Sequence, residues 1–347
     1  MIWWVNTFSV QFFCRKMTEP QPHIAIAILN FNGRSLLEAY LPSVLATTYP
    51  NRSVWVIDNQ STDDSVLWLQ QHYPGVGLIK NAGNFGFAKG YNDGLKDIKA
   101  DYYLLLNSDV EVGPGFIEPV ITDMEADKRI AFAQPKMRWM RKPEYFEYAG
   151  AAGGLLDPLG YPYCRGRLFD KLEIDAGQYN DSPFVFWASG ACMFARADAY
   201  WQLGGFYEYF FMHSEEIDLC WRAQNAGYKI LACGKSSAMH LGAASLQKES
   251  PRKTLFNFRN NLVMLARNMP VGRLIWVLLL RLGLDGLAAI TFLLKGENGS
   301  AGAVFNAWFA FIGWFIKKKV NKYPGKRGFK RLDGVSLKLA LWSRYIH

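Results

Sequence analysis

Residues 104–111 of the chain read Leu-Leu-Leu-Asn-Ser-Asp-Val-Glu, an apolar strand followed directly by a short acidic cluster. In an open α/β sheet, ligands bind just beyond the carboxyl ends of the strands. Carboxylates at that position are well placed to hold a divalent cation against a substrate diphosphate. A solvated β-turn explains the same residue types, since Asn, Ser and Asp are common in turns. The sequence on either side decides between these two interpretations.

Buried strands and helices alternate around this segment. Predicted strands cover residues 24–29, 54–57, 76–80 and 102–106, and predicted helices cover 35–45, 65–72 and a stretch ending near 98. Ser35 and Glu38 match a capping box at the start of the first helix. Strands that alternate with helices at this spacing predict an α/β fold with a Rossmann-like, mostly parallel sheet and flanking helices.

Composition divides the chain into four segments. Residues 1–22 are an N-terminal extension, in which Met17 is a candidate natural start and a short membrane-surface anchor is the alternative. Residues 23–115 carry the regular alternation, and residues 116–262 are richer in Gly, Pro and aromatic residues, which is typical of binding loops around a second pocket. Residues 263–347 form a helical, apolar and basic tail that we expect to associate with a membrane.

The net charge of +9 originates at the C-terminal end. From Lys317 onward ten Lys and Arg residues stand against one acid, Asp333, and the remaining 29 basic and 29 acidic residues cancel. A basic tail after an apolar segment favours an anionic membrane surface over nucleic acid as the partner. The five cysteines are odd in number and form no Cys-x-x-Cys pair, which favours a reducing, cytoplasmic location.

Two long apolar runs precede this basic end. Leu274–Leu294 is interrupted only by Arg281 and Asp285, and Ala301–Ile316 is the second run. The first is long enough to cross a bilayer, but charges at the bilayer centre cost about 2.5–3.5 kcal/mol each. Because Arg281 and Asp285 are four residues apart, they share one helix face and can pair. We expect two amphipathic helices lying in the membrane interface, with a buried helical hairpin in a dimer as the alternative.

Asp58 and Asp109 end the second and fourth predicted strands, and such strand ends can converge on one crevice. Asp58 could accept hydrogen bonds from a nucleobase or ribose, and Asp109 could ligate a metal that bridges phosphates. Between them, the loop 81–90 joins a strand to a helix. It matches neither a Walker loop nor the dinucleotide fingerprint. Its glycines either make a tight turn or let the backbone approach a ligand.

A second acidic cluster, Glu215, Glu216 and Asp218, opens a predicted helix. Acids at this position complement the helix dipole, or one of them acts as a general base for a hydroxyl nucleophile, desolvated so that its pKa rises. Glu215 and Asp218 share a helix face, whereas Glu216 points elsewhere. His240 follows an apolar stretch and is either a packed residue or, with carboxylate and diphosphate oxygens, a ligand suited to Mn²⁺.

Over residues 24–261 the chain resembles inverting family-2 glycosyltransferases with the GT-A fold, especially bacterial rhamnosyltransferase-like members. The resemblance rests on the order and spacing of short motifs, none of which is decisive alone. In chain order they are residues 29–33 (Leu-Asn-Phe-Asn-Gly), 57–59 with Ser61 and Asp63, Asn84 with 86–88, 92–94, 106–109, 204–206, 210–212, 215–219 with Arg222, 227–228 and His240.

The resemblance implies that residues 23–115 bind a nucleotide-sugar donor and that residues 116–262 form the acceptor and catalytic half. Asp58 stands at the position that holds the nucleobase. Further donor contacts are expected from Asn30, Asn32, Asn84, Gly86, Lys89, Asn107, Ser108 and Asp109. The chain would transfer a hexosyl or deoxyhexosyl group with inversion, in the assembly of a cell-surface polysaccharide or glycolipid.

Asn107-Ser108-Asp109 stands where the family carries its DxD-type motif. The resemblance therefore implies that Asp109 ligates a divalent Mn²⁺ or Mg²⁺ ion, with His240 as its companion. Asn107 replaces the first acid of a full motif, which weakens metal binding on charge grounds, and Glu111 is placed to compensate.

Glu216 matches the catalytic-base position of the family, which is usually an aspartate. The extra methylene could shift the carboxylate by about an ångström, and such a shift can cost up to ~10²-fold in rate. Asp218 is therefore a rival base. In the implied mechanism, the acceptor hydroxyl attacks the anomeric carbon opposite the departing nucleoside diphosphate while the base removes its proton. One displacement inverts the anomeric centre and needs no covalent intermediate.

Two other functions use similar parts. A sugar-nucleotide pyrophosphorylase is expected to carry a Gly-rich phosphate loop after the first strand, where this chain reads Asn-Phe-Asn-Gly at 30–33. A non-catalytic, membrane-associated nucleotide-sugar-binding module is the other alternative, motivated by the departures at Asn107 and Glu216. The apolar and basic tail makes a lipid-linked saccharide at the inner face of the cell membrane the expected acceptor.

Overall fold

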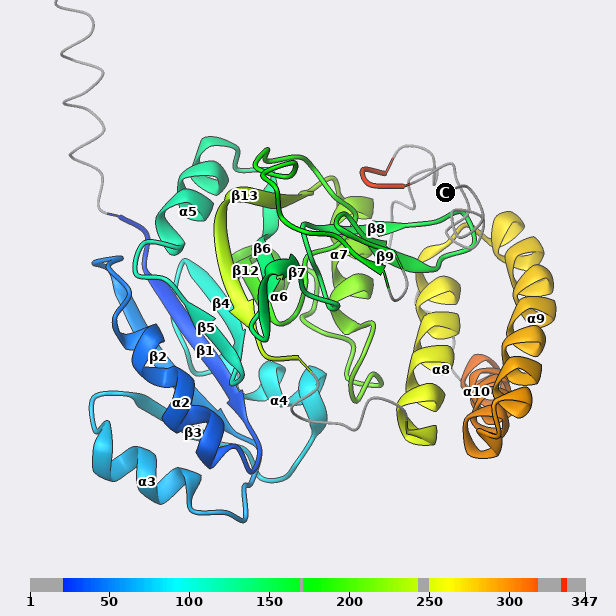
Figure 1. Cartoon of the computed structure of the whole chain (residues 1–347), viewed down its shortest axis with the longest axis horizontal. Coiled ribbons are helices and arrows are strands. Elements are labelled where there is room, and N and C mark those ends of the chain that lie inside the picture. The colour runs from blue at the N-terminus through cyan, green and yellow to red at the C-terminus, as the bar shows by residue number, and fades with distance from the viewer. Residues whose placement is uncertain (1–20, 169–170, 243–249, 318–331, 336–347) are drawn as a thin grey trace, which may run out of the picture.

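The computed structural model of this chain describes residues 21–168, 171–242, 250–317 and 332–335, so the predicted N-terminal extension lies almost wholly outside them. A nine-stranded sheet forms the centre (Figure 1). Its first part is parallel, in the spatial order β3 (Gly77–Lys80), β2 (Arg52–Asp58), β1 (Ile24–Asn30) and β4 (Tyr102–Asn107). The predicted alternation of parallel strands and helices is confirmed.

The second part of the sheet is mixed in direction. β12 (Cys192–Arg196) runs antiparallel to both β4 and β6 (Ile130–Trp139), and β13 (Lys229–His240) lies parallel to β6. β5 (Val110–Val112) pairs antiparallel with β13, and β7 (Lys142–Phe146) pairs antiparallel with β6. Because β12 joins β4 to β6, the two predicted halves of the chain share one sheet. The sequence pattern does not predict this antiparallel insertion.

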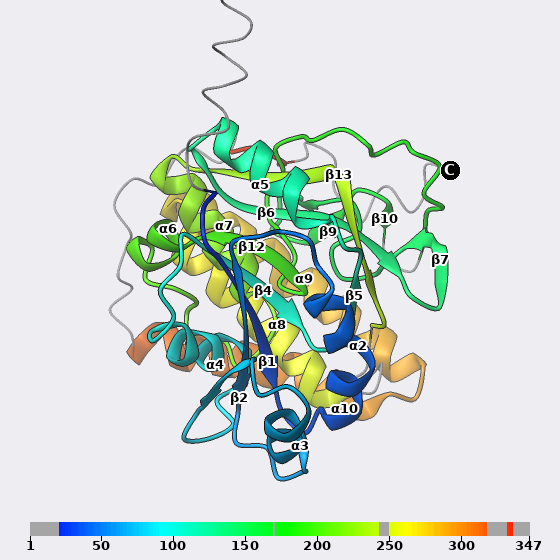
Figure 2. The ribbon, with the colours of Figure 1, turned by 90° about the vertical axis from the view of Figure 1, so that its left-hand side faces the viewer.

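Helices cover both faces of the sheet (Figures 1 and 2). On one face pack α2 (Arg34–Leu45), α3 (Ser65–His72) and α5 (Ile117–Ala126). On the other pack α4 (Gly86–Leu95), α6 (Ala197–Gln202), α7 (Glu215–Ala226) and α8 (Pro251–Asn268). Alternate residues of β1 enter the two layers, Ala25 on one side and Ile26 on the other. Strands buried on both faces read as continuous apolar runs, which explains residues 24–29.

The predicted capping box at the start of α2 is wrong. The helix begins at Arg34 with Gly33 as its N-cap residue, no side-chain hydrogen bond caps it, and Ser35 lies inside the first turn. Instead, Asp63 Oδ2 accepts the Arg34 N–H at 3.1 Å, and Glu38 pairs with the Arg34 guanidinium at 2.8 Å. A tertiary contact from the loop after β2 therefore takes the role of the expected local cap.

A second, smaller sheet is antiparallel and lies within residues 154–172. Its strands are β8 (Gly154–Leu156), β9 (Pro162–Cys164), β10 (Arg167–Leu168) and β11 (Lys171–Leu172). The loop between β8 and β9 packs on α8, where Asn261 Nδ2 donates a hydrogen bond to the Gly160 carbonyl at 2.8 Å. This contact ties the small sheet to the C-terminal helices.

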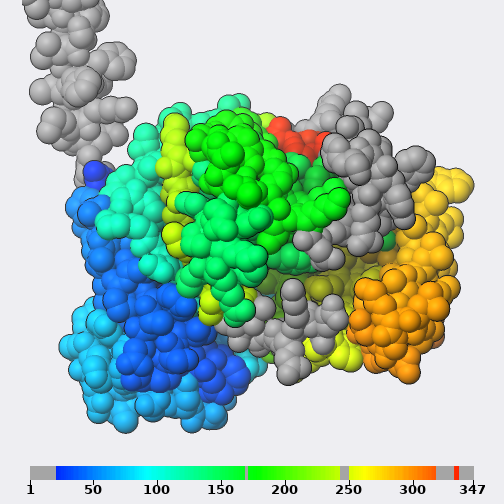
Figure 3. Space-filling view, in the orientation of Figure 1, coloured from blue at the N-terminus to red at the C-terminus, as the bar shows by residue number. Residues whose placement is uncertain are grey.

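α9 (Val271–Leu294) and α10 (Asn298–Lys317) follow α8, and the three helices pack against one another. They form one end of the molecule, coloured yellow to orange in the ribbon and space-filling views (Figures 1 and 3). By length and composition alone, both α9 and α10 could cross a membrane. The predicted pairing of Arg281 with Asp285 is confirmed at 3.2 Å, and both side chains are buried.

Candidate active site at the carboxyl ends of the strands

Asn30 and Asp58 lie side by side where β1 and β2 end, since the parallel register pairs them directly. Asp58 Oδ1 accepts hydrogen bonds from Asn30 Nδ2 at 3.0 Å and from Ser61 Oγ at 2.6 Å. Its Oδ2 accepts one from the Ser61 N–H at 2.9 Å. A carboxylate oxygen offers about two acceptor positions, so Oδ2 retains one. Asp58 therefore orders the turn after β2.

Asn32 connects the loops that follow β1 and β2. Its φ of 50° is left-handed, a conformation that Asn tolerates better than most residues. Its Oδ1 accepts the Thr62 N–H at 2.7 Å, and its own N–H donates to Ser61 Oγ at 2.9 Å. Asn32 is also exposed at the strand ends, so the side chain predicted to contact the donor is accessible.

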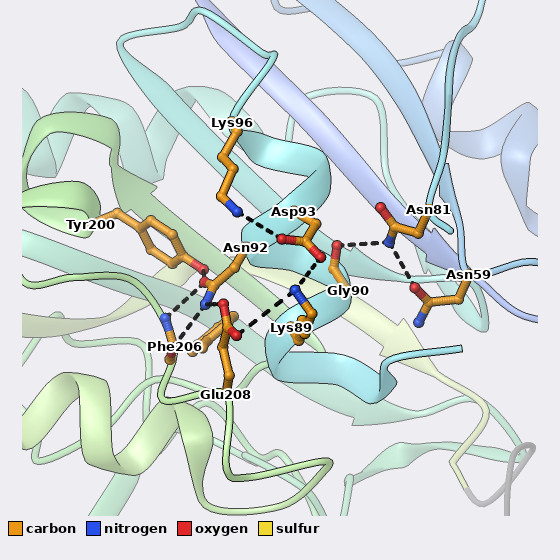
Figure 4. A network of polar contacts seen from close by, with 10 residues as sticks. All are labelled: Asn59, Asn81, Lys89, Gly90, Asn92, Asp93, Lys96, Tyr200, Phe206 and Glu208. Carbon is orange, nitrogen blue, oxygen red and sulfur yellow. Dashed lines mark hydrogen bonds and ion pairs between the residues drawn. The ribbon is translucent and has the colours of Figure 1, made fainter. Parts of the chain in front are cut away.

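The loop before α4 is held by a network of side-chain amides (Figure 4). Asn81 Nδ2 donates to Asn59 Oδ1 at 2.7 Å, and Asn59 Nδ2 donates to the Gly86 carbonyl at 2.9 Å. Gly86 has a φ of +73°, and a Cβ at this position would overlap the Phe211 carbonyl. Gly86 is therefore required by both conformation and close approach, which explains the predicted importance of this glycine without a ligand.

Two predicted donor-binding side chains are engaged by the protein itself. Asn84 Oδ1 accepts the Gly86 N–H at 3.1 Å, which closes the turn that begins α4. Lys89 Nζ lies 2.6 Å from Asp93 Oδ2 and 3.8 Å from Glu208 Oε2 (Figure 4). Lys89 therefore supports α4 through its ion pair with Asp93.

The acidic end of β4 lies close to the end of β1. Asn107 and Ser108 are half-buried and Asp109 is buried. A Cβ on Gly33, the N-cap residue of α2, would stand 3.8 Å from Ser108 Oγ, so the loops after β1 and β4 meet. The predicted convergence of strand ends on one region is therefore present. Glu111 is exposed on β5, and within the described residues it makes no ion pair with His240.

His240 and Asp109 are brought together by the pairing of β13 with β5. His240 Nε2 lies 3.1 Å from Asp109 Oδ1, and Nδ1 lies 3.3 Å from the carboxylate of Glu147, a residue that the sequence interpretation does not single out. All three side chains are buried. Burial alone would lower the pKa of His240, but its hydrogen bond to Asp109 and the nearby Glu147 carboxylate outweigh this effect and raise the pKa to about 10.

Glu216 stands in the first turn of α7, after His213 and Ser214, which have left-handed φ values of 70° and 72°. Its Oε2 is shielded from solvent and has no hydrogen-bond partner within the part of the chain that the structure describes. Burial raises the pKa of Glu216 to about 7. Burial and the neighbouring Glu216 charge raise the pKa of Glu215 well above its usual range. A carboxylate with a pKa near neutrality suits a general base.

Asp218 has a different environment from its two neighbours. Its Oδ2 lies 2.8 Å from Arg222 Nε, and its Oδ1 lies 3.0 Å from Arg267 Nε and accepts a hydrogen bond from Asn268 at 2.7 Å. Burial would raise the pKa of Asp218, but the charges of Arg267 and Arg222 outweigh it and lower the pKa. Because both oxygens are used and the side chain is fully buried, the prediction of Asp218 as a rival base is at odds with this geometry. Asp218 instead joins α7 to α8.

Glu216 and the acidic end of β4 are linked through the segment before β12. A Cβ on Gly190 would lie 3.8 Å from Glu216 Cβ and 3.1 Å from the Phe87 ring. The adjacent Ala191 carbonyl accepts the Asn107 N–H at 3.0 Å. Gly190 and Ala191 therefore lie between Glu216 and the Asn107–Asp109 cluster, with Gly190 beside Glu216 and Ala191 bonded to Asn107.

Comparison with known proteins places the chain in a family. Residues 25–203, about half of the chain, match the family described as "Glycosyl transferase family 2". The chain belongs to this family, and the predictions of a glycosyl transfer enzyme and of a GT-A fold are confirmed.

Two relatives carry rhamnosyltransferase names. The chain is 26% identical over 268 residues to the N-acetylglucosaminyl-diphospho-decaprenol L-rhamnosyltransferase of Mycobacterium tuberculosis, covering 72% of this chain and 85% of that protein. It is 26% identical over 212 residues to the rhamnosyltransferase WbbL of Escherichia coli, covering 58% of this chain and 79% of the relative. The resemblance to rhamnosyltransferase-like members is therefore confirmed.

Solved structures agree on the fold at low sequence identity. GalNAc-T7 with UDP, GalNAc and Mn²⁺ has a TM-score of 0.56 and 16% identity, over 72% of this chain and 48% of that one. The mannosyltransferase PcManGT from Pyrobaculum calidifontis with GDP-Man and Mn²⁺ has a TM-score of 0.51 and 11% identity, over 90% and 95%. At this level of identity the likeness shows the fold alone.

Proposed function

We propose that this protein transfers a sugar from a nucleoside-diphosphate sugar to a saccharide hydroxyl with inversion, and that Glu216 is its general base. The observation that carries the proposal is the Glu216 carboxylate itself, whose Oε2 is shielded from solvent and has no described partner. A carboxylate with a pKa of about 7 is ionised in part of the molecules at neutral pH. It is then basic enough to accept a proton from an attacking hydroxyl.

In the proposed reaction, the acceptor hydroxyl approaches the anomeric carbon from the side opposite the diphosphate. Glu216 accepts the hydroxyl proton as the new carbon–oxygen bond forms and the bond to the nucleoside diphosphate breaks. Glu215 is buried beside it, and burial together with the Glu216 charge raises the pKa of Glu215 well above its usual range. Asp218 holds α7 in place through Arg222 and Arg267.

The residues at the end of β4 and β13 fit a divalent cation. Asp109 Oδ1 and His240 Nε2 lie 3.1 Å apart, so a carboxylate oxygen and an imidazole nitrogen are available side by side. A carboxylate and an imidazole suit Mn²⁺. Asp109 and His240 would hold the ion, which when bound neutralises charge on the leaving diphosphate. Within the described residues no group of three His, Cys, Asp or Glu side chains forms a metal site, so donor oxygens would complete the coordination.

The two apolar helices support a membrane-bound acceptor. Of the 20 large hydrophobic side chains that are exposed among the described residues, 15 lie on α9 and α10. Trp276 and Phe309 are 70% and 72% exposed, whereas Arg281 and Asp285 point into the protein. Such an outward apolar face beside a basic tail is typical of helices that lie in a membrane interface. We infer that α9 and α10 rest on the inner face of the cell membrane, next to a lipid-linked saccharide.

The donor hypothesis is tested by calorimetry of the purified protein with UDP-, dTDP- and GDP-sugars, with and without Mn²⁺. We expect metal-dependent binding of one donor, lost in Asp109→Ala and retained in Glu216→Gln, while transfer to an acceptor is lost in both. Glu216→Asp, which restores the family's more common residue, should keep measurable transfer. If no donor binds under any metal condition, the transferase proposal fails. Donor binding without transfer to any saccharide would favour a non-catalytic module.

The membrane hypothesis is tested with vesicles of phosphatidylcholine alone or with 30% phosphatidylglycerol. We expect co-sedimentation that is stronger with the anionic lipid and at least ten-fold weaker for Leu279→Asp combined with Leu287→Asp. The exposed Leu67→Asp on α3 is the matched control, since Leu67 is 57% exposed and lies on another part of the molecule. Concentration-dependent dimerisation that the double substitution abolishes, without vesicle binding, would favour the helical hairpin of a dimer.

A further inference from the structure

Glu147 is the third member of the buried cluster around His240. It follows β7, and its Oε2 accepts the Ala149 N–H at 2.6 Å and lies 3.3 Å from His240 Nδ1. The residue is 3% exposed. Among the described residues no Lys or Arg lies within 4.0 Å of its carboxylate, and the imidazole is its sole ion-pair partner. A buried carboxylate without a cation is costly, so its place beside the ring requires an explanation.

The orientation of the imidazole separates the roles of the two carboxylates. Nε2 forms a hydrogen bond with Asp109 Oδ1, whereas Nδ1 lies 3.3 Å from Glu147 Oε2 in an ion contact, so the two acids lie on opposite edges of the ring. A cation held between Asp109 and Nε2 is therefore out of reach of Glu147. A histidine that ligates a metal through one nitrogen almost always donates its other N–H to a carboxylate, a carbonyl or water, which fixes the tautomer.

The backbone around Glu147 is shaped for this contact. Gly242, directly after β13, has a φ of +68°, and a Cβ there would stand 3.1 Å from Glu147 Oε1. The Glu147 N–H donates to the Met137 carbonyl at 2.9 Å, which fixes the residue on β6. His240 itself lies at the end of β13, which pairs with β6 from Lys229 to Cys233 and again from Ser237 to His240. Glu147 and His240 are therefore both held in place by backbone hydrogen bonds to β6.

We propose that Glu147 is the positioning residue of the metal site, and that its carboxylate beside Nδ1 holds the His240 ring so that Nε2 faces the cation shared with Asp109. The inference rests on the proposed function, because it assumes a divalent cation at Asp109 and His240. It assigns a role to a residue outside the motifs that define the resemblance. Glu147 touches neither substrate nor cation and acts through His240 alone.

The test is direct measurement of Mn²⁺ affinity by electron paramagnetic resonance of the free ion, with UDP, GDP or dTDP present. We expect Glu147→Ala to weaken Mn²⁺ binding 10- to 100-fold, the range found for residues that orient a ligand histidine. Glu147→Gln keeps the shape of the side chain and should weaken Mn²⁺ binding by a smaller factor than Glu147→Ala. Glu144→Gln, an exposed glutamate on the adjacent β7, is the matched control and should stay within two-fold of wild type.

A double-substitution cycle separates positioning from a general structural role. If Glu147 acts through His240, then Glu147→Ala should weaken Mn²⁺ binding little further once His240→Ala is present. Additive losses in the double variant would overturn the proposal. So would wild-type Mn²⁺ affinity in a Glu147→Gln protein that unfolds at the wild-type temperature. If the wild-type protein binds no Mn²⁺ with any nucleotide, the proposed metal site fails first, and the inference fails with it.

Discussion

Asn260 donates a hydrogen bond to the His213 carbonyl at 2.8 Å, and this contact joins α8 to the turn that precedes Glu216. The same Nδ2 also donates to the Met212 carbonyl at 2.8 Å. His213 and Ser214 both have left-handed φ values, which cost of order 1–3 kcal/mol each in residues other than Gly. Asn260 is fully buried and stabilises this strained turn.

Replacing Asn260 by Ala should therefore damage catalysis more than donor binding. We expect kcat to fall about 10- to 100-fold, because Glu216 loses its fixed position, with donor KM changed less than three-fold. Asn257→Ala, an exposed position on the same helix, is the control and should resemble wild type. Steady-state kinetics with donor affinity from calorimetry make the comparison. Equal losses in donor binding and turnover would contradict this role.

The pH dependence of turnover should report the Glu216 carboxyl. Its pKa is raised to about 7, and the base is active when deprotonated, so activity should rise with pH through about 7 and level off above it. Below that value kcat should fall about ten-fold per pH unit as the carboxylate is protonated. A profile of kcat between pH 5.5 and 9 at saturating donor checks this. A rate that stays flat from pH 6 to 8 would exclude Glu216 as the base.

Asp218 should contribute stability and not proton transfer. Asp218→Asn leaves Arg222 and Arg267 buried beside a neutral amide, and breaking such a pair costs roughly 3–5 kcal/mol in the free energy of unfolding. Because the pKa of Asp218 is lowered in the folded state, its stabilisation is present above the ordinary Asp pKa and is lost as the pH falls through the folded value. Urea unfolding at pH 7 and pH 4 measures both effects.

The exposed Asp64→Asn is the control for this measurement, since the side chain of Asp64 is 69% exposed. It should change the free energy of unfolding by less than about 0.5 kcal/mol. An Asp218→Asn protein of normal stability that has lost all activity would instead return Asp218 to the role of a base.

The buried pair on α9 predicts a non-additive effect on stability. Arg281 also donates to Asn261 Oδ1 at 2.5 Å, and Asp285 accepts hydrogen bonds from Tyr161 and Trp308 at 3.1 Å each. Arg281→Leu alone leaves the Asp285 charge unpaired and should cost roughly 3–5 kcal/mol. Arg281→Leu with Asp285→Leu should recover part of that loss. Thermal unfolding of the single and double variants in detergent tests this prediction. A smaller loss of stability in the single variant than in the double variant would contradict it.

The regular part of the fold is predictable because its signals are local. The strands at 24–29 and 102–106 are continuous apolar runs, and the helix at 65–72 has the predicted bounds. The antiparallel insertion of β12 is not predictable, since its pairing with β4 depends on contacts about 90 residues apart along the chain. The capping box fails for a related reason, because Asp63 from another loop satisfies the helix start instead.

The candidate site is predictable only where a residue sits at a strand end or opens a helix. Asp109 and Glu216 carry such signals, and the geometry is consistent with their proposed roles. Glu147 and Asn260 carry none, since one lies in an irregular segment and the other inside a helix. Their importance arises from tertiary contacts to His240 and His213. Lys89 is the opposite case. Its position in the loop suggests a contact with the donor, but its side chain forms a salt bridge with Asp93.

Two consecutive asparagines on α8 have consequences for how the enzyme can be shortened. Asn260 holds the turn before Glu216, while Asn261 bonds both the Gly160 carbonyl and Arg281 of α9. Deleting the apolar helices, a common route to a soluble enzyme, would remove Arg281 and uncover the side of α8 on which they pack. Activity lost on truncation would then report a loosened catalytic turn, and it would carry no information about whether the acceptor needs a membrane.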